Sequence, residues 1–274
     1  MARCVWGIGG GSDFYTACSL ARPSDIIFTS LSPIIIDNAI NLAETVSKYT
    51  GKPYQLEGKG PQSAKKSYTC YSKHISPDLC MILNDARRPK SYGVVIPPQE
   101  FPEAFERCCS EVLQLLNGCT VLAVDTGGDS LRGIVPNMGD NDISGLFGNT
   151  RDTRDSDSLR IIRMITKSCV DLIICGPGAD GETKGESLDV AWKSLSLRRL
   201  TETYELVDEG DMLQLSHDIK GASGWKDPAP GSTISNIVRA LESDDDFTII
   251  YRLGREVCKV RTILLRSFWR IRIL

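Results

Sequence analysis

The chain has 274 residues, of which 41% are hydrophobic and 24% are charged, and its formal net charge is -3 at pH 7. This length provides enough apolar residues for a sizeable buried core. The near-neutral charge gives no sign of a nucleic-acid partner.

The cysteines and histidines argue against a zinc protein. There are ten cysteines and two histidines, and no Cys-x-x-Cys pair occurs, so a zinc site of standard spacing is disfavoured. We interpret the cysteines as reduced thiols of a cytoplasmic protein. The N-terminus does not fit a secretory signal, and no stretch approaches the roughly 20 apolar residues of a transmembrane helix.

The predicted elements alternate between strands and helices. The predicted strands span residues 2–6, 25–31, 93–96, 119–125 and 170–175, with a hairpin of 246–251 and 257–260 near the end. The predicted helices span residues 14–21, 37–49, 100–116, 156–167, 184–200 and 232–241. Residues 51–80 show no clear pattern, and residues 132–151 and 216–231 are expected to be loops.

Continuous apolar strands that alternate with helices are typical of a parallel sheet covered on both faces. We therefore predict a single Rossmann-like α/β domain over residues 1–274, doubly wound and mainly parallel, with helices on both faces of the sheet. Residues 261–274 mix four arginines with apolar residues. We expect them to form a peripheral basic and apolar tail, either packed on the domain or contacting a partner or membrane surface.

Three glycine loops follow predicted strands, at residues 7–13, 124–129 and 175–182. Ligands of an open parallel sheet bind beyond the carboxyl ends of its strands, so we expect these loops to lie at one edge. Glycine turns and the N-terminus of a helix both present N–H groups that suit a phosphate. The candidate ligand-binding residues are Gly9, Gly10, Gly11, Ser12, Asp13, Gly127, Gly128, Gly176, Gly178 and Gly181.

The same loops contain acids. We interpret Asp125, Asp129, Asp180 and Glu182 as candidate catalytic residues, with Asp129 and Asp180 also as metal ligands. Carboxylates beside exposed N–H groups suit Mg²⁺ or another divalent cation that bridges to phosphate, and one of them could be a general base. Two further acids, Asp155 and Asp157, either face this site or serve only to cap the helix that follows.

Other site types fit the sequence less well. Gly7-x-Gly9-x-x-Ser12 lacks the third glycine of a dinucleotide fingerprint, and no acid ends the second strand, so NAD is disfavoured. No Gly-Lys-Ser/Thr sequence or Gly-x-Ser-x-Gly elbow occurs. A nucleophilic pair of Cys175 with His217 and a purely structural role for the glycines remain as alternatives.

The three loops and their order resemble an uncharacterised α/β family, catalogued as a domain of unknown function (DUF1152). The residues that carry this resemblance are Gly9-Gly10-Gly11-Ser12-Asp13, Val124-Asp125-Thr126-Gly127-Gly128-Asp129 and Gly176-Pro177-Gly178-Ala179-Asp180-Gly181-Glu182. Asp155-Ser156-Asp157-Ser158-Leu159 is similar to the helix start that the family has between its second and third motifs. The resemblance covers roughly residues 1–200, and it implies a Rossmann-like fold and a shared glycine and acid site, without a known reaction.

The sequence therefore predicts a small-molecule enzyme that binds a small anionic metabolite, phosphorylated or nucleotide-like, with a divalent cation. The alternative is a non-catalytic ligand-binding or regulatory domain of the same fold. An interaction protein that works through residues 261–274 is the third hypothesis.

Overall fold

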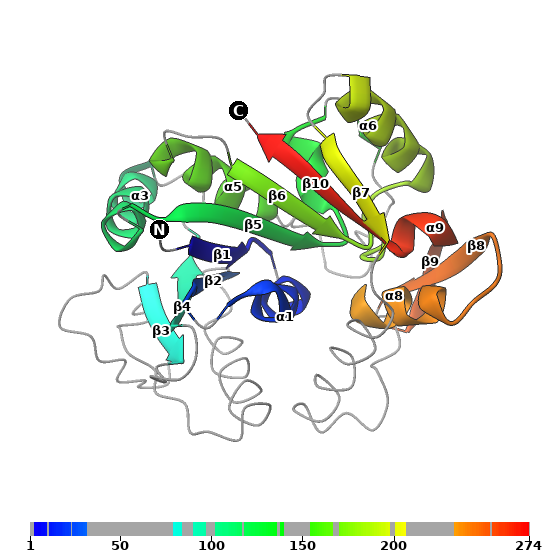
Figure 1. The fold of residues 1–274 in the computed structure, drawn as a ribbon, viewed down its shortest axis with the longest axis horizontal. Coiled ribbons are helices and arrows are strands. Elements are labelled where there is room, and N and C mark those ends of the chain that lie inside the picture. The colour runs from blue at the N-terminus through cyan, green and yellow to red at the C-terminus, as the bar shows by residue number, and fades with distance from the viewer. Residues whose placement is uncertain are drawn as a thin grey trace.

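A computed structural model describes most of the chain (Figure 1). The described residues are 3–9, 11–22, 24–31, 79–83, 90–96, 102–116, 118–135, 138–139, 154–166, 170–197, 201–206, 233–252 and 254–273. The predicted helix 37–49, the predicted loop 216–231, Gly10, His74 and His217 lie outside these residues.

The described residues form one large sheet with the strand order β3-β4-β2-β1-β5-β6-β10-β7. Its five central strands, from β4 to β6, run parallel to one another, whereas β3 and β10 run antiparallel to their neighbours. The prediction of an α/β fold with a mainly parallel sheet is thus confirmed. The strands are β1 (Arg3–Gly7), β2 (Ile26–Leu31), β3 (Leu79–Leu83), β4 (Lys90–Val95), β5 (Thr120–Thr126), β6 (Val170–Cys175), β7 (Thr201–Leu206) and β10 (Ser267–Ile273).

The parallel strands form where the sequence has continuous apolar runs. In β1, Cys4, Val5 and Trp6 are all fully buried. A row of aromatic rings crosses three strands, since Trp6 packs edge-on against Phe28 at 5.1 Å and Phe28 against Tyr92 at 5.5 Å between ring centroids. Aromatic pairs in such edge-to-face geometry add stability beyond the area that they bury.

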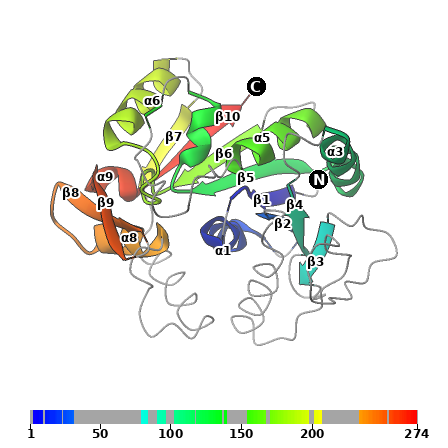
Figure 2. The same ribbon diagram turned by 180° about the vertical axis from the view of Figure 1, so that it is seen from behind.

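Helices lie on opposite sides of this sheet. Helix α1 (Gly11–Leu20) contacts β1, β2 and β5 from one side, while α3 (Pro102–Leu115) packs on α5 (Arg154–Ile165) on the other. The view from behind shows the same separation (Figure 2). Helix α6 (Gly185–Leu197) follows β6. None of the helices formed by the described residues is long and apolar enough to cross a membrane.

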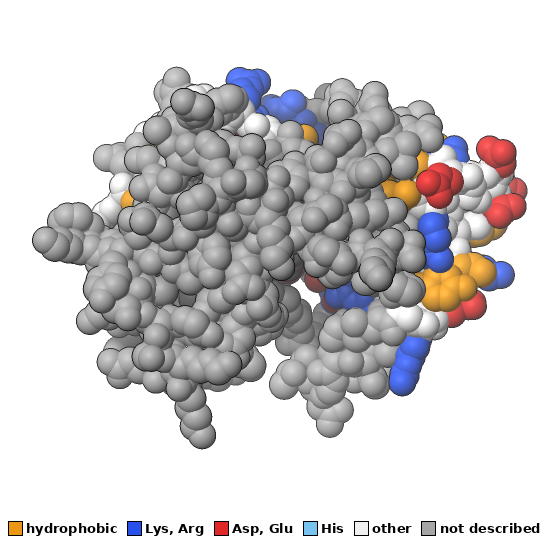
Figure 3. All heavy atoms as spheres, turned by 90° about the horizontal axis from the view of Figure 1, so that it is seen from below, with side chains coloured by type: hydrophobic (Ala, Val, Ile, Leu, Met, Phe, Trp, Pro, Cys, Tyr) orange, Lys and Arg blue, Asp and Glu red, His pale blue; other side chains and the backbone are white. Residues whose placement is uncertain are grey.

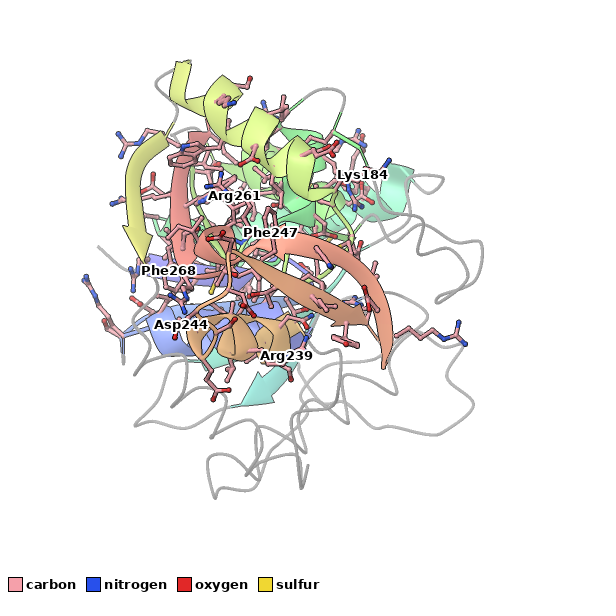
Figure 4. The ribbon with its side chains drawn as sticks, turned by 90° about the vertical axis from the view of Figure 1, so that its right-hand side faces the viewer. Lys184, Arg239, Asp244, Phe247, Arg261 and Phe268 are labelled. Atoms are coloured by element: carbon pink, nitrogen blue, oxygen red, sulfur yellow. The ribbon has the colours of Figure 1, made fainter. Side chains whose placement is uncertain are left out.

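The C-terminal part of the chain differs from the prediction. The predicted hairpin is present as β8 (Phe247–Arg252) and β9 (Arg255–Arg261), and it lies between α6 and α8 (Thr233–Leu241) (Figure 4). After the short helix α9 (Thr262–Leu265), however, the chain enters the sheet as β10, between β6 and β7. Trp269 and Ile271 of β10 are fully buried.

Residues 267–273 are therefore a strand of the main sheet and not a peripheral tail, which agrees with the packed arrangement of the two that the sequence left open. Side chains alternate between the two faces of a strand, so the buried Trp269, Ile271 and Ile273 share one face of β10, while Arg270 and Arg272 lie on the other. Both arginines pair with Asp171 of β6, at 2.5 and 3.4 Å. Two of the four arginines of the segment thus belong to one face of a core strand.

Candidate functional site

The sheet topology brings the first two glycine loops together. From β1 the chain proceeds to β2 on one side, whereas β5 and β6 lie on the other, so the loops after β1 and β5 begin on adjacent strands where the strand order reverses. This position is the usual ligand site of an open α/β sheet. The loop after β6 starts on the next strand, so all three loops leave the same edge.

Three carboxylates meet at this edge. Oxygen atoms of Asp13, Asp125 and Asp155 all lie within 4.8 Å of one another. They come from three separate elements: the first turn of α1, the end of β5 and the first turn of α5. We call these three residues the triad. The triad and the adjoining Asp129 and Asp180 together form the carboxylate cluster.

Each carboxylate of the triad is held by its surroundings. Asp13 accepts a hydrogen bond from the backbone N–H of Thr126 at 2.8 Å. Asp125 accepts bonds from the backbone N–H groups of Gly128 at 3.0 Å and Ser130 at 3.1 Å, and from the Ser130 hydroxyl. Such partners orient metal-ligating side chains in known metal sites.

Asp155 is positioned by a chain of buried polar groups. Ser158, three residues later on the same side of α5, donates to the carbonyl of Ile8 at 2.9 Å and shares a hydrogen bond with the Ser30 hydroxyl at 2.7 Å. The Ser30 hydroxyl also accepts a bond from the indole N–H of Trp6 at 2.8 Å. This chain ties α5 to β1 and β2, so the start of α5 is fixed over the end of β1.

Helix α1 is fixed in a similar way. The Thr126 hydroxyl donates to the Thr16 hydroxyl at 2.8 Å, and the Thr16 hydroxyl donates to the carbonyl of Ser12 at 3.0 Å. These contacts hold the first turn of α1 against the end of β5. Gly11 and Ser12 therefore begin a helix whose N-terminus, with its partial positive charge, lies beside the carboxylate cluster.

Two glycines make room for the acids. A Cβ atom on Gly9 would overlap Asp13 and lie 2.5 Å from Asp155, and a Cβ atom on Gly127 would lie 2.5 Å from Oδ2 of Asp180. Gly127 also has a φ of +124°, which other residues rarely adopt. At both positions glycine lets carboxylates approach the backbone closely.

The other glycines serve packing. A Cβ atom on Gly176 would meet Ile237 of α8, one on Gly178 would meet Leu188 and Val260, and one on Gly181 would meet Ile250. Their backbone amides are also engaged within the protein, because Gly176 donates to the carbonyl of Ser267 and Gly178 to that of Gly127, at 3.0 and 2.6 Å. The amides of Gly127, Gly128 and Gly181 donate to Cys175, Asp125 and Gly178.

These engaged amides change the interpretation of the glycine loops. The roles predicted for Gly176 and Gly178 as anion-binding residues gain no support from their contacts, which hold the third loop against the second loop and the C-terminal elements. The N-terminus of α1 is the part of the three loops that best retains the predicted anion-binding character.

Burial and mutual repulsion disfavour the charged form of the clustered acids. Burial and the charge of Asp129 raise the pKa of Asp125 to about 7. Burial, with the charges of Asp125 and Asp129, raises the pKa of Asp13 well above its usual value. Burial, with Asp129 and Asp13, does the same to the pKa of Asp155.

Asp180 has a distinctive environment. Its Oδ1 accepts a hydrogen bond from the N–H of Glu182 at 2.9 Å, whereas its buried Oδ2 has no hydrogen-bond partner among the described residues. Burial, followed by the charges of Asp129 and Glu182, raises its pKa well above the usual value. A buried carboxylate oxygen without a donor is costly unless a proton or cation occupies it.

Glu182 does not share this environment. It pairs with Arg132 at 3.6 Å and with Arg252 at 3.3 Å. Arg132 belongs to the 3-10 turn η1 (Asp129–Gly133), which follows the second glycine loop, and Arg252 ends β8. On the face shown in Figure 3, the described side chains at one side of the molecule include acidic, basic and hydrophobic ones.

The sequence therefore predicted the edge of the sheet at which the carboxylate cluster lies and named only part of that cluster. The sequence did not distinguish Asp155 from Asp157, because both lie at the start of the same predicted helix. In the structure Asp155 belongs to the triad, whereas Asp157 is buried and is not part of it. The predicted metal ligands Asp129 and Asp180 adjoin the triad. Arg132 and Arg252 were missed, and no local motif marks either of them.

Comparison with known proteins adds no assignment, since no protein-family model, curated protein or solved structure matches this chain.

Proposed function

We propose that this protein binds a divalent cation in the carboxylate cluster and uses it to hold a phosphorylated or nucleotide-like small molecule. The observation that carries the proposal is the meeting of Asp13, Asp125 and Asp155 with their oxygens within 4.8 Å. Like charges at this distance, two of them buried and the third half-buried, repel strongly, and a cation relieves that repulsion. An all-oxygen ligand set favours a hard ion such as Mg²⁺, Mn²⁺ or Ca²⁺.

The anionic ligand follows from the position of the cation. A cation at the switch between β1 and β5 would lie beside the N-terminus of α1, where helix N–H groups attract phosphate. A phosphate that bridges the cation and this N-terminus would satisfy both. The position also fits the Rossmann-like winding that we propose for the sheet.

We further propose that the protein is an enzyme in which Asp180 is the general base. Its Oδ2 lies buried without a donor among the described residues, and burial with the charges of Asp129 and Glu182 raises its pKa, so it accepts a proton more readily than an ordinary carboxylate. A water or hydroxyl group bound to the cation would lose its proton to Asp180. Cys175 is a poor nucleophile by comparison, because burial raises the pKa of its thiol far above the usual value.

Calorimetric titration with Mn²⁺ and Mg²⁺ tests the cation site. We expect Asp155→Asn to weaken Mn²⁺ binding at least 10-fold. The matched control is Asp189→Asn, which removes a partly exposed carboxylate that pairs with Arg261 on the surface and should leave Mn²⁺ binding unchanged. Equal Mn²⁺ binding by both variants and the wild type would refute the proposed site.

Product analysis with nucleotides and sugar phosphates in the presence of Mn²⁺ tests the enzyme proposal. Turnover that is lost in Asp180→Asn, with Mn²⁺ binding retained, supports Asp180 as the base. Ligand binding without any product would show instead a non-catalytic binding domain.

A further inference from the structure

We propose that Arg132 and Arg252 form an anion subsite that receives a phosphoryl group of the ligand, and that Glu182 occupies this subsite when no ligand is bound. The inference rests on the proposed function, because it assigns the second half of the same site. The ligand class is an anion that carries phosphoryl groups. The two arginines, and not the amides of the third glycine loop, would bind this anion.

The first argument is the convergence of the two guanidinium groups. Arg132 and Arg252 come from elements far apart in sequence, and both lie against the single carboxylate of Glu182. Two guanidinium groups thus contact the same carboxylate. All three side chains are only partly buried, with exposures from 14% to 23%, so a ligand can reach them.

The second argument is the looseness of these ion pairs. Their distances of 3.6 and 3.3 Å exceed the roughly 2.7–2.9 Å of a strong charge-assisted hydrogen bond. Glu182 therefore holds neither arginine tightly. A phosphoryl group has three oxygens and can accept from both guanidinium groups at once, which a single carboxylate at these distances does not.

The third argument is the start of α8. Arg252 also contacts the Thr233 hydroxyl at 3.2 Å, and Thr233 is the first residue of α8. The first turn of this nine-residue helix contains no acid, so its positive end is not neutralised by its own side chains. Arg252 thus connects the carboxylate of Glu182 with the start of α8.

The arrangement is held from within. Asn236 of α8 is fully buried and donates to the carbonyls of Ala179, in the third loop, and Tyr251, next to Arg252, at 2.8 and 2.9 Å. Its side-chain oxygen accepts from the N–H of Tyr251 at 3.1 Å. Asn236 is therefore a positioning residue that keeps the end of β8 beside the third loop.

The subsite is linked to the carboxylate cluster. The backbone N–H of Glu182 donates to Asp180, and Arg132 lies three residues after Asp129. Asp180, whose Oδ2 has no hydrogen-bond partner among the described residues, thus lies between the carboxylate cluster and Glu182. A ligand with two phosphoryl groups could thus place one on the cation and the other on the arginines.

The test uses the full-length protein and inorganic pyrophosphate as the probe. Calorimetry should detect pyrophosphate binding in the presence of Mn²⁺. Arg132→Gln and Arg252→Gln should each weaken pyrophosphate binding at least 10-fold and leave Mn²⁺ binding unchanged. Arg261→Gln is the matched control: this arginine is exposed at the end of β9 (labelled in Figure 4) and pairs with Asp189, and the variant should bind pyrophosphate as the wild type does.

Two conservative variants separate binding from folding. Glu182→Gln should strengthen pyrophosphate binding, because a neutral amide competes less for the arginines, and a merely structural ion pair would not give this gain. Arg252→Lys keeps the positive charge and replaces Arg252→Gln in the test if that variant fails to fold. It should bind pyrophosphate with an affinity between those of the wild type and a variant without the charge.

The possible results separate the two proposals. Pyrophosphate binding that is equal in the wild type and both arginine variants, or absent from a wild type that binds Mn²⁺, would overturn the subsite. Arginine-dependent pyrophosphate binding by a protein that does not bind Mn²⁺ would support the subsite and refute the cation site.

Discussion

Replacing Asp155 by asparagine should stabilise the metal-free protein while it removes the cation site. Asp155 lies within 4.8 Å of two other carboxylates. Two unit charges at this distance repel by roughly 3 kcal/mol at an effective dielectric constant of about 20. Because burial and mutual repulsion raise the pKa of Asp13, Asp125 and Asp155, these carboxyl groups carry less than full charge and the gain is smaller than this figure; we expect about 2 kcal/mol at pH 8.

The stabilisation by Asp155→Asn should be larger at high pH than at low pH. The pKa of Asp125 is raised from 3.8 to about 7 in the folded state, so the folded protein binds more protons than the unfolded chain between these values. The free energy of unfolding therefore falls as the pH rises through this window, by roughly 4 kcal/mol for Asp125 alone. Acidification to pH 5 should remove most of the repulsion.

Urea denaturation at pH 5 and pH 8, without metal and with saturating Mn²⁺, measures both effects. We expect Asp155→Asn to be more stable than the wild type at pH 8 without metal, and nearly equal to it at pH 5. Mn²⁺ should stabilise the wild type and have little effect on the variant. The control Asp189→Asn should stay within about 0.5 kcal/mol of the wild type throughout.

One result would refute this reasoning. If Asp155→Asn lowers the free energy of unfolding at pH 8 in the absence of metal, the Asp155 charge is already compensated within the protein and the cluster has no need of a cation.

Three further predictions concern the groups that shape the site. Gly127→Ala should lower the free energy of unfolding by about 2 kcal/mol or more in urea titrations and weaken Mn²⁺ binding, since φ is +124° and the new Cβ would lie 2.5 Å from Asp180; wild-type values for both would contradict this. Ser158→Ala should cost about 2 kcal/mol and also weaken Mn²⁺ binding, because it removes the hydroxyl between Ser30 and Ile8; lost stability with unchanged Mn²⁺ affinity would show that this chain does not position the start of α5. Burial raises the pKa of the Cys175 thiol, so mass spectrometry should find it unmodified by iodoacetamide in the folded protein and modified in urea; rapid labelling of the folded protein would contradict its burial.

The centre of the fold was predictable because burial on both faces leaves a local signature. Strands β1, β5 and β6 are largely apolar, and β6 is predicted with the same ends that it has in the structure. The edge strand β7 lacks this apolar character, and it was not predicted. Apolar and polar residues do alternate along β10, but its two arginines led us to interpret this core strand as part of a basic tail. Their pairing with Asp171 is a contact between distant segments, which the local sequence does not reveal.

The site shows the same division between local and distant information. Strand ends and glycines are visible in the sequence, so the edge that carries Asp13, Asp125 and Asp180 could be inferred. The function of each glycine could not, because it depends on what faces the missing Cβ atom: a carboxylate at Gly9, and an apolar side chain at Gly176. Likewise, only the fold decides which acid at the start of α5 joins the triad.

Anomalous diffraction from crystals grown with Mn²⁺ tests the cation site most directly. We expect an anomalous peak within about 2.5 Å of carboxylate oxygens of Asp13, Asp125 and Asp155, and none at that place in Asp155→Asn crystals. Crystals that contain Mn²⁺ at saturating concentration but show no peak among these three side chains would contradict the central claim that the buried acids form a metal site.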